Sequence, residues 1–392
     1  MAALAPATTW IAGYGQTRFG RQPEAGLTGL AVEAAEASLA DAGLGPDRVE
    51  GVFLGSFAAL ALGGQGFPAA VLADRLGLGP VPAFALEGAC ASGSLAFTRA
   101  VAAIEAGELD IALVVGSELM SAHPTTDVTA ALARANDIDS ESFRAGLTFP
   151  GFFALLARAY ADRYDVDIEL LADVSVKNRD HGARNPMAHF QKPIGRAEAS
   201  GARPIADPLR LYDCSPVSDG AAALVLTSAR SLPEGSSSPV RVIAVGQAAG
   251  ATSPERMDSF VGLTAAQHAA RSAFDAAQVG PDDIDVAEVH DCFSIAEWVA
   301  LEDLGLFPRG EAAAATASGA TRVGGQVAVN TSGGLLAKGH PVGATGVAQL
   351  GEIVHQLRGD AHVQVDDAQV GVTHNVGGTG GVAVVAVLGD AR

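Results

Sequence analysis

The feature that most constrains this chain is a sequence pattern that occurs twice. The alanine-rich segment 34–42 leads into Gly-Pro-Asp at residues 45–47, and the similar segment 269–277 leads into Gly-Pro-Asp at residues 280–282. Two such helices could resemble each other by chance, but residues typical of strands follow in register in both copies. The offset of 235 residues (280 − 45) therefore indicates duplication. We expect two similar halves, joined near Ser231–Pro239.

Short β-branched runs alternate with helical patterns along both halves. Such alternation favours an α/β fold with mostly parallel sheets that are covered on both faces. The expected helices are 27–42, 92–105, 265–277 and 344–357, and the expected strands are 49–54, 111–115, 285–289, 371–373 and 381–388.

Composition excludes several classes of protein. With 25 basic and 44 acidic residues, the net charge of −19 argues against binding to nucleic acid or to an anionic membrane. No apolar stretch approaches the ~20 residues of a membrane span. Residues 1–12 lack the basic start of a signal peptide, and the three cysteines fit neither a disulfide framework nor a zinc site. We therefore expect a cytoplasmic protein with free thiols.

A polar segment from about residue 121 to 213 fits neither half and is rich in basic residues. Each of these basic residues could simply be a surface charge that faces solvent on an exposed segment. Clustered against a net charge of −19, they are the best candidates to bind a phosphate-rich ligand. They are Lys177, Arg179, Arg184, Lys192, Arg196, Arg203 and Arg210.

Cys90 stands between small residues directly before the expected helix 92–105. The positive end of a helix lowers a thiol pKa from ~8.5 toward the thiolate range. Most lone cysteines are small buried core residues, but small neighbours would let a substrate carbonyl approach this one. Cys90 is therefore a candidate nucleophile.

His290, Asp291 and Cys292 follow an expected strand in the second half. The carboxyl ends of strands are where α/β sheets usually carry their active sites. Because alternate residues of a strand point the same way, His290 and Cys292 could face one cavity while Asp291 faces elsewhere. A buried core histidine is the simpler interpretation of His290 alone, and the neighbouring cysteine weakens it.

Two glycine-rich segments are the remaining candidates for a functional site. His340 lies within segment 333–346, whose glycines allow close backbone approach, and it could act as a general base for a thiol. Segment 373–381 could present backbone N–H groups to an oxyanion, or it could be a plain hairpin turn. The glycines of segment 333–346 do not match a dinucleotide-binding fingerprint or a P-loop. Together, a thiol, a histidine, a second thiol and an oxyanion cradle suit acyl transfer through a thioester.

These motifs resemble those of the thiolases, and specifically of the sterol-carrier-protein type, over nearly the whole chain. Cys90-Ala91-Ser92 is similar to the CxS loop, 339–341 to the GHP loop, and 290–293 to the HDCF variant of the NEAF loop. Segment 218–222 is similar to the one that closes the family's insertion. The chain departs from the CxG loop, where it has Asn375-Val376-Gly377, so the usual acid/base cysteine is absent.

The resemblance implies the fold. It is two duplicated βαβαβαββ halves in a five-layered α-β-α-β-α sandwich, with an inserted loop domain over coenzyme A. The implied N-terminal half spans 1–120 and 214–232, the insertion 121–213, and the C-terminal half 239–392.

The resemblance also implies roles. Cys90 would form an acyl-enzyme with help from His340, and Cys292 would move a proton at the α-carbon. His290 and His340 would stabilise the enolate, and the N–H groups of Cys90 and Gly377 would hold the oxyanion. The implied contacts to coenzyme A are Lys177, Arg179, Arg184, Lys192, Arg196 and Asn375.

The implied activity is thiolytic cleavage of 3-ketoacyl-CoA or the reverse Claisen condensation, in lipid metabolism. We expect a homodimer or tetramer and neither a metal nor a redox cofactor. Three alternatives stay open: an aldolase or an acyltransferase that works with a small OB-fold, zinc-ribbon partner, or a non-catalytic acyl-CoA-binding subunit. Ketosynthases are weaker rivals, because they pair the cysteine with histidine or asparagine in other motifs.

Overall fold

A computed structural model describes residues 9–234 and 238–389. Residues 1–8, where most of the segment tested for a signal peptide lies, and residues 235–237 of the expected linker fall outside the described residues. The first half supplies β1 (Thr9–Gln16), β2 (Gly51–Gly55), β3 (Ala83–Leu86), β4 (Ile111–Glu118) and β7 (Gly220–Ser228). The second supplies β8 (Val240–Ala249), β9 (Val286–Glu288), β10 (Ala328–Val329), β11 (Val370–Gly377) and β12 (Val382–Gly389).

The two halves have the same topology. The strands lie in the order β3-β2-β4-β7-β1 in the first half and β10-β9-β11-β12-β8 in the second. Within each half the third strand to appear therefore lies at the edge, followed by the second, fourth, fifth and first. Parallel and antiparallel pairs also fall at equivalent places. The duplication predicted from the sequence is confirmed.

The expectation of mostly parallel sheets is wrong. Parallel pairing joins β2 to β3 and β4, and β9 to β10 and β11, whereas the other neighbouring strands are antiparallel. The reason is the end of each repeat: its last strand returns antiparallel between the fourth strand and the first. Strands β11 and β12 form a direct hairpin, which needs no crossover helix.

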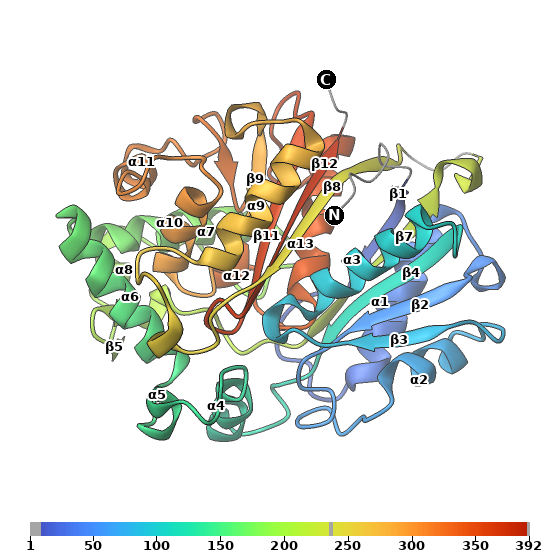
Figure 1. The fold of residues 1–392 in the computed structure, drawn as a ribbon, viewed down its shortest axis with the longest axis horizontal. Coiled ribbons are helices and arrows are strands. Elements are labelled where there is room, and N and C mark those ends of the chain that lie inside the picture. The colour runs from blue at the N-terminus through green and yellow to red at the C-terminus, as the bar shows by residue number, and fades with distance from the viewer. Residues whose placement is uncertain (1–8, 235–237, 390–392) are drawn as a thin grey trace.

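Helices cover both sheets and fill the space between them (Figure 1). Along β4, Leu113 and Val115 face an outer core while Ala112 and Val114 face the central one, as strand alternation requires. Helices α1 (Leu27–Ala42) and α2 (Pro68–Arg75) cover the first sheet, α3 (Ser92–Glu105) and α13 (Thr345–Arg358) form the middle layer, and α9 (Thr264–Ala277) and α10 (Ser294–Asp303) cover the second sheet.

The sheets join edge to edge, because β1 pairs with β8 at Trp10–Arg241 and Ile11–Val240. The ten strands therefore form one continuous sheet that folds around the central helices α3 and α13. The result is the five-layered α/β arrangement expected from the sequence.

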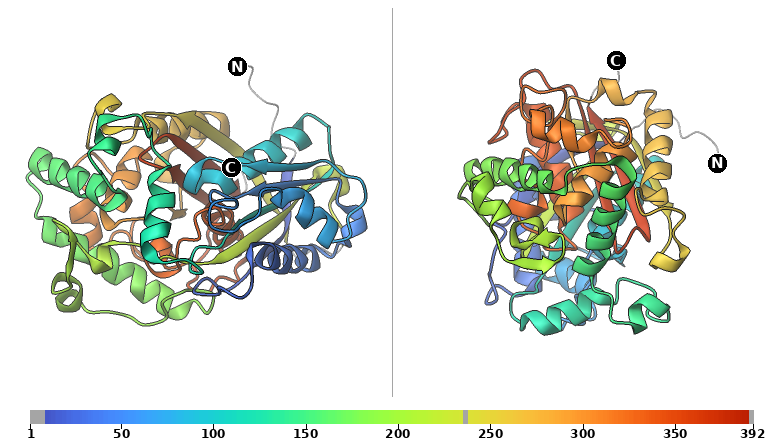
Figure 2. Two further views of the ribbon diagram at one scale, coloured as in Figure 1. Left: turned by 90° about the horizontal axis from the view of Figure 1, so that it is seen from below. Right: turned by 90° about the vertical axis from the view of Figure 1, so that its left-hand side faces the viewer.

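The segment between β4 and β7 forms a mainly helical cap beside the second half (green in Figure 2). The domain boundaries 1–120, 121–213, 214–232 and 239–392 stay a prediction. No helix in the described part of the chain is long and apolar enough to cross a membrane. The cap contains α4 (Thr125–Ala133), α5 (Glu141–Arg144), α6 (Phe149–Tyr164), α7 (Leu171–Arg184), α8 (Arg196–Ser200), β5 (Pro204–Ala206) and β6 (Leu209–Arg210).

Candidate active site

One pocket of about 380 Å³ brings together the reactive residues singled out in the sequence. Cys90 from the first half lines it with His290, Cys292 and His340 from the second. Cys214, to which the sequence analysis assigned no role, lies on the same wall. All three cysteines of the chain therefore share one cavity.

The fold places these residues at strand ends. Cys90 lies in a tight turn, Ala89–Ala91, between β3 and α3, and His290 and Cys292 follow β9. His340 lies in the loop that leads to α13. That loop approaches closely because a Cβ atom on Gly93 would lie only 2.5 Å from the carbonyl oxygen of Gly343.

Asp291 points away from the pocket, as the alternation along a strand predicts. It is fully buried, and its carboxylate accepts hydrogen bonds from the backbone N–H of Leu335 at 2.6 Å and from the side chain of Asn178 at 2.7 Å. Asp291 thus anchors the loop that carries His290 and Cys292 to its surroundings.

The hydrogen bonds of His340 define its tautomer. The hydroxyl of Thr345 donates its proton to the carbonyl oxygen of Pro341 at 3.1 Å and lies 2.7 Å from Nδ1 of His340. When the hydroxyl donates to Pro341, its oxygen accepts from the ring, and this arrangement places the ring proton on Nδ1. The Nε2 atom of the neutral ring then has a free lone pair and can act as a base.

Burial controls the protonation of the site. It lowers the pKa of His340 to about 3. Burial, with a smaller contribution from the neighbouring His340 and His374, lowers the pKa of His290 well below its usual range. Both imidazole rings are therefore neutral near pH 7.

The expectation that the adjacent helix end lowers the pKa of Cys90 is wrong. Burial raises its pKa to about 12, outweighing the N–H group of Gly378, which lowers it, while Glu118 raises it further. Burial, followed by the proximity of Cys90, likewise raises the pKa of Cys292 well above its usual range. Both thiols therefore keep their protons until a base removes them during the reaction.

The backbone donor near Cys90 is Gly378, one residue after the expected Gly377. Gly377 ends β11 and packs against Gly88, where a Cβ atom would lie 2.1 Å from the carbonyl oxygen. Gly378 lines the pocket, and its backbone N–H group acts to lower the pKa of the Cys90 thiol. The segment is both a hairpin turn and a source of a backbone donor.

Asn375 does not line the pocket, contrary to the expectation that it contacts coenzyme A. It is fully buried behind His290, and its Nδ2 atom lies 3.0 Å from Nδ1 of that ring. On its other side, the Oδ1 atom accepts a hydrogen bond of 2.8 Å from the hydroxyl of Ser94 in α3. Asn375 therefore touches a reactive residue and not the cavity.

The basic residues of the cap do not reach the pocket either. Lys177 is 1% exposed and forms an ion pair of 2.8 Å with Glu297. The carboxylate of Glu297 therefore neutralises its charge inside the protein. Arg179 lies over the rings of Phe190 and Tyr212. The expectation that these two residues bind coenzyme A is therefore not supported by their positions.

The remaining three candidates are exposed. Arg184 pairs with Asp180 at 2.6 Å and Arg196 with Asp173 at 3.2 Å, so acidic neighbours partly neutralise both charges. Lys192 is also exposed, and none of the three lines the pocket.

Sequence reasoning missed the apolar wall of the pocket. The cap contributes Leu132 from α4 and Phe149 and Phe153 from α6, opposite Phe293 and Val342 of the second half. Among the described residues that line the pocket, no carboxylate, ammonium or guanidinium group occurs. Apolar residues of a helix predict a core, and only the folded cap shows that these ones border a cavity.

Glu118 was also missed. Its buried carboxylate accepts hydrogen bonds from the N–H groups of Phe57, Ala58 and Gly343, at 2.9 to 3.1 Å. The side chain thus ties the loop after β2 to the loop that carries His340. A glutamate at the end of a strand gives no sequence signal for this contact across the fold.

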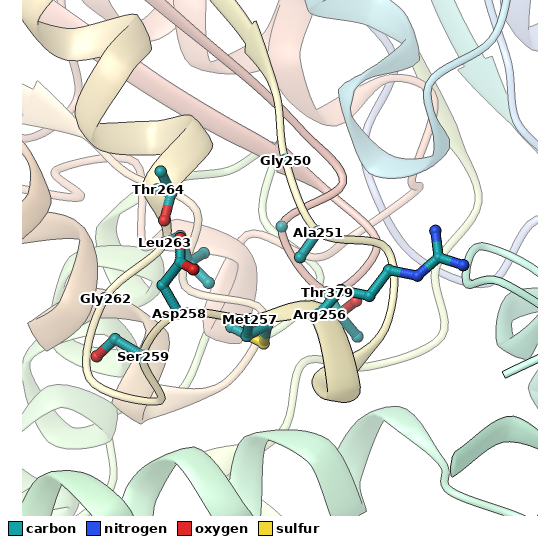
Figure 3. Close-up of a pocket in the computed structure, with 11 residues that line it drawn as sticks. Gly250, Ala251, Arg256, Met257, Asp258, Ser259, Gly262, Leu263, Thr264 and Thr379 are labelled. Carbon is teal, nitrogen blue, oxygen red and sulfur yellow. The ribbon is translucent and has the colours of Figure 1, made fainter. Parts of the chain in front are cut away.

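Two further pockets adjoin the one that holds the thiols, because they share lining residues. Thr148 lines both the main pocket and the next one, and Thr379 lines that one and a third. The third pocket, of about 140 Å³, has Arg256 and Thr379 on its wall (Figure 3). Its other residues come mainly from the loop that connects β8 to α9.

Ligand atoms of Cys90, His290 and His340 lie within 4.8 Å of one another, close enough to surround a metal ion. This is a soft, nitrogen- and sulfur-bearing set of the kind that binds Zn²⁺. The absence of a metal from the native protein stays a prediction.

A thiol beside a neutral imidazole base and a second thiol, at the strand ends of a duplicated α/β fold, defines a thiol-dependent acyltransferase site. Comparison with family models narrows the class. The model described as the N-terminal domain of thiolase matches residues 9–230, and the thiolase C-terminal domain-like model matches residues 246–390. The chain belongs to the thiolase family and is a thiolase-type acyltransferase.

Individual proteins agree with this assignment. The chain is 41% identical to an acetyl-CoA acetyltransferase of Methanothermobacter thermautotrophicus, covering 96% of this chain and 98% of that protein. It is 33% identical to sterol carrier protein 2 of Oryctolagus cuniculus, over 96% of this chain and 71% of that protein. A solved Ltp2-ChsH2(DUF35) aldolase superposes with a TM-score of 0.83 at 26% identity, over 99% of both chains.

Proposed function

We propose that the protein cleaves 3-ketoacyl-CoA by thiolysis, or runs the reverse Claisen condensation, through an acyl-enzyme on Cys90. The observation that carries this proposal is the single pocket shared by Cys90 and Cys292, with the basic Nε2 atom of His340 beside them. The thiol of Cys90 can hold the acyl group while the thiol of Cys292 transfers a proton to or from the α-carbon.

In the cleavage direction, His340 accepts the proton of Cys90 as the sulfur attacks the keto carbon. A carbon–sulfur bond forms, the carbon–carbon bond to the α-carbon breaks, and Cys292 gives its proton to the departing enolate. Coenzyme A then transfers its thiol proton to the Cys292 thiolate, and its sulfur attacks the acyl-enzyme. This attack releases the shortened acyl-CoA and the Cys90 thiolate. His340 returns its proton to Cys90. The N–H groups of Cys90 and Gly378 would stabilise the oxyanion; one such donor is typically worth ~2.7–4 kcal/mol.

The pockets suggest how the substrate binds. The apolar wall around Leu132 and Phe149 suits an uncharged acyl chain. The adjoining pockets beside Thr148 and Thr379 would hold the pantetheine arm, with Arg256 near the coenzyme A phosphates. Arg256 thus replaces the cap residues predicted from the sequence, and the chemistry requires neither a metal nor a redox cofactor.

We further propose a homodimer or a tetramer built from it. Strand β3 is the edge of the first half, and Phe84 on it is 43% exposed. An unpaired apolar edge strand favours pairing with a second copy. We also retain the expectation of a cytoplasmic enzyme of lipid metabolism, which fits three free cysteines.

The variants Cys90→Ala and Cys292→Ala test the division of labour. After incubation with acetyl-CoA, mass spectrometry should find an acetyl group on Cys292→Ala and on the wild type but not on Cys90→Ala. Neither variant should form or break the carbon–carbon bond. Equal loss of acylation in both variants would refute the proposed roles.

A second candidate is an aldolase that works with a separate partner protein, as the solved aldolase neighbour suggests. An aldolase of this kind needs no acyl-enzyme. Lack of labelling in the wild type, with aldol cleavage appearing on addition of an OB-fold partner, would favour it.

A further inference from the structure

Asn375 connects the two catalytic halves through hydrogen bonds. Its Oδ1 atom accepts from Ser94, on the helix that begins just after Cys90, and its Nδ2 atom faces Nδ1 of His290 at 3.0 Å. All three side chains are buried. The sequence analysis placed Asn375 where thiolases have the CxG cysteine but gave it no part in the chemistry.

An amide nitrogen donates hydrogen bonds and has no lone pair to accept one. The Nδ1 atom of His290 must therefore accept from Asn375, and a neutral ring that accepts at Nδ1 carries its proton on Nε2. His340 has the opposite arrangement, because its Nδ1 atom donates to Thr345. Of two neutral rings on the same pocket, one presents a proton and the other a lone pair.

We propose that Asn375 is a positioning residue that holds His290 in the Nε2–H tautomer, so that before the reaction begins His290 donates in the pocket while His340 accepts. This inference rests on the proposed function, in which His290 stabilises an enolate oxygen and His340 removes a thiol proton. Exchanging the two tautomers would leave the enolate without this donor.

The packing holds the side chain of Asn375 in its place between the two halves. A Cβ atom on Gly346 would lie 2.0 Å from Oγ of Ser94 and 2.6 Å from Oδ1 of Asn375. The glycine in α13 therefore leaves the space that this pair of side chains occupies. With Ser94 and His290 on either side, the side-chain amide is held between two elements that belong to different halves.

The same hydrogen bond has a consequence for metal binding. A protonated Nε2 atom cannot coordinate a cation, so Asn375 removes one of the three ligands from the cluster of Cys90, His290 and His340. A carboxylate at position 375 would accept from Nδ1 and turn the lone pair of Nε2 toward the pocket. That arrangement, with a carboxylate behind the histidine, is the one that metal sites use.

The first experiment uses the unmodified protein, labelled with ¹⁵N on its nine histidines. Two-bond proton–nitrogen NMR spectra distinguish the two neutral tautomers, and the His290→Gln variant identifies the signals of that ring. We expect a proton on Nε2 of His290 and on Nδ1 of His340. A proton on Nδ1 of His290 would overturn the proposal, whatever the acyl-enzyme experiment shows.

The second experiment measures the binding of Zn²⁺ alone by calorimetry to the wild type, Asn375→Asp and the control Asn375→Ala. Carboxylates behind metal-bound histidines typically change affinity by ~10–100-fold. We expect tighter binding of that order for Asn375→Asp only. Equal affinity in the folded Asp variant and the wild type would contradict the proposal; if that variant does not fold, the NMR result decides.

Discussion

The imidazole rings of His290 and His340 meet edge to face, with their centroids 5.1 Å apart and their planes at 81°. Two protonated rings at this distance in a buried site would repel each other strongly, and burial lowers both pKa values. The site therefore works with neutral histidines and protonated thiols. Proton transfer must accompany the attack of the sulfur instead of preceding it.

Alkylation of Cys90 tests this protonation state. Because burial raises its pKa to about 12, the thiolate fraction should keep increasing roughly tenfold per pH unit between pH 7 and 10. The rate of labelling by iodoacetamide, followed by peptide mass spectrometry, should rise in parallel. Cys214 lines the same pocket, so the measurement needs a Cys214→Ala background. A plateau below pH 9 would contradict the expected pKa.

Lys177 and Lys192 form a matched pair, since both were expected to bind coenzyme A. Lys177→Met leaves Glu297 buried without its cation and should lower the free energy of unfolding by ~3–5 kcal/mol. Lys192→Met, on the surface, should change it by less than ~0.5 kcal/mol. Urea denaturation measures both, and equal effects would show that the Lys177 ion pair is unimportant.

Arg256 should matter for coenzyme A more than the arginines of the cap do. We expect Arg256→Glu to raise KM for acyl-CoA by ~10-fold with little change in kcat, because a repulsive charge weakens binding of the phosphates without reaching the thiols. Both arginines pair with an aspartate, but Arg184 lines none of these pockets, so Arg184→Glu is the control and should have a much smaller effect. The two variants are compared by steady-state kinetics at low salt, and the reverse ranking would restore the sequence-based assignment.

Glu118 should make stability depend on pH. Burial raises its pKa from 4.5 to about 7, so the folded protein binds a proton there that the unfolded chain has lost. The corresponding stabilisation is complete below pH 4.5 and is lost as pH rises through 7, by ~3 kcal/mol for a shift of this size.

Glu118→Gln removes that contribution, so its destabilisation relative to the wild type should be largest at pH 5 and smallest at pH 8. Unfolding curves at the two pH values measure the difference, with Glu108→Gln on the surface as the control. Parallel behaviour of Glu118→Gln and the wild type would show that Glu118 does not titrate in this range.

Local patterns in the sequence were enough to place the helices of the repeat. The predicted spans 27–42 and 92–105 coincide with α1 and α3. Gly43 ends α1 in the left-handed conformation that glycine adopts most easily, so the boundary is encoded locally. Cys90 and His340 could be found in the same way, because small residues and glycines surround them, whereas His290 and Cys292 were found from their place after an expected strand.

Properties that depend on distant partners could not be predicted. A lysine in a polar helix looks exposed, and only the fold brings Glu297 to Lys177. The pKa of Cys90 was misjudged because its helix is visible in the sequence while the burial that outweighs it is not. Cys214 has no distinguishing neighbours, and its place beside the pocket follows from the packing of the cap.

The short pairing of β1 with β8 restricts how the enzyme can open. It locks the two sheets together at Trp10 and Ile11, around helices that belong to a shared core. This arrangement opposes a separation of the two halves to admit a bulky thioester. Any motion that the catalytic cycle requires would then come from α4 and α6 of the cap, which line the pocket. The motion of these two helices would set which acyl groups can enter.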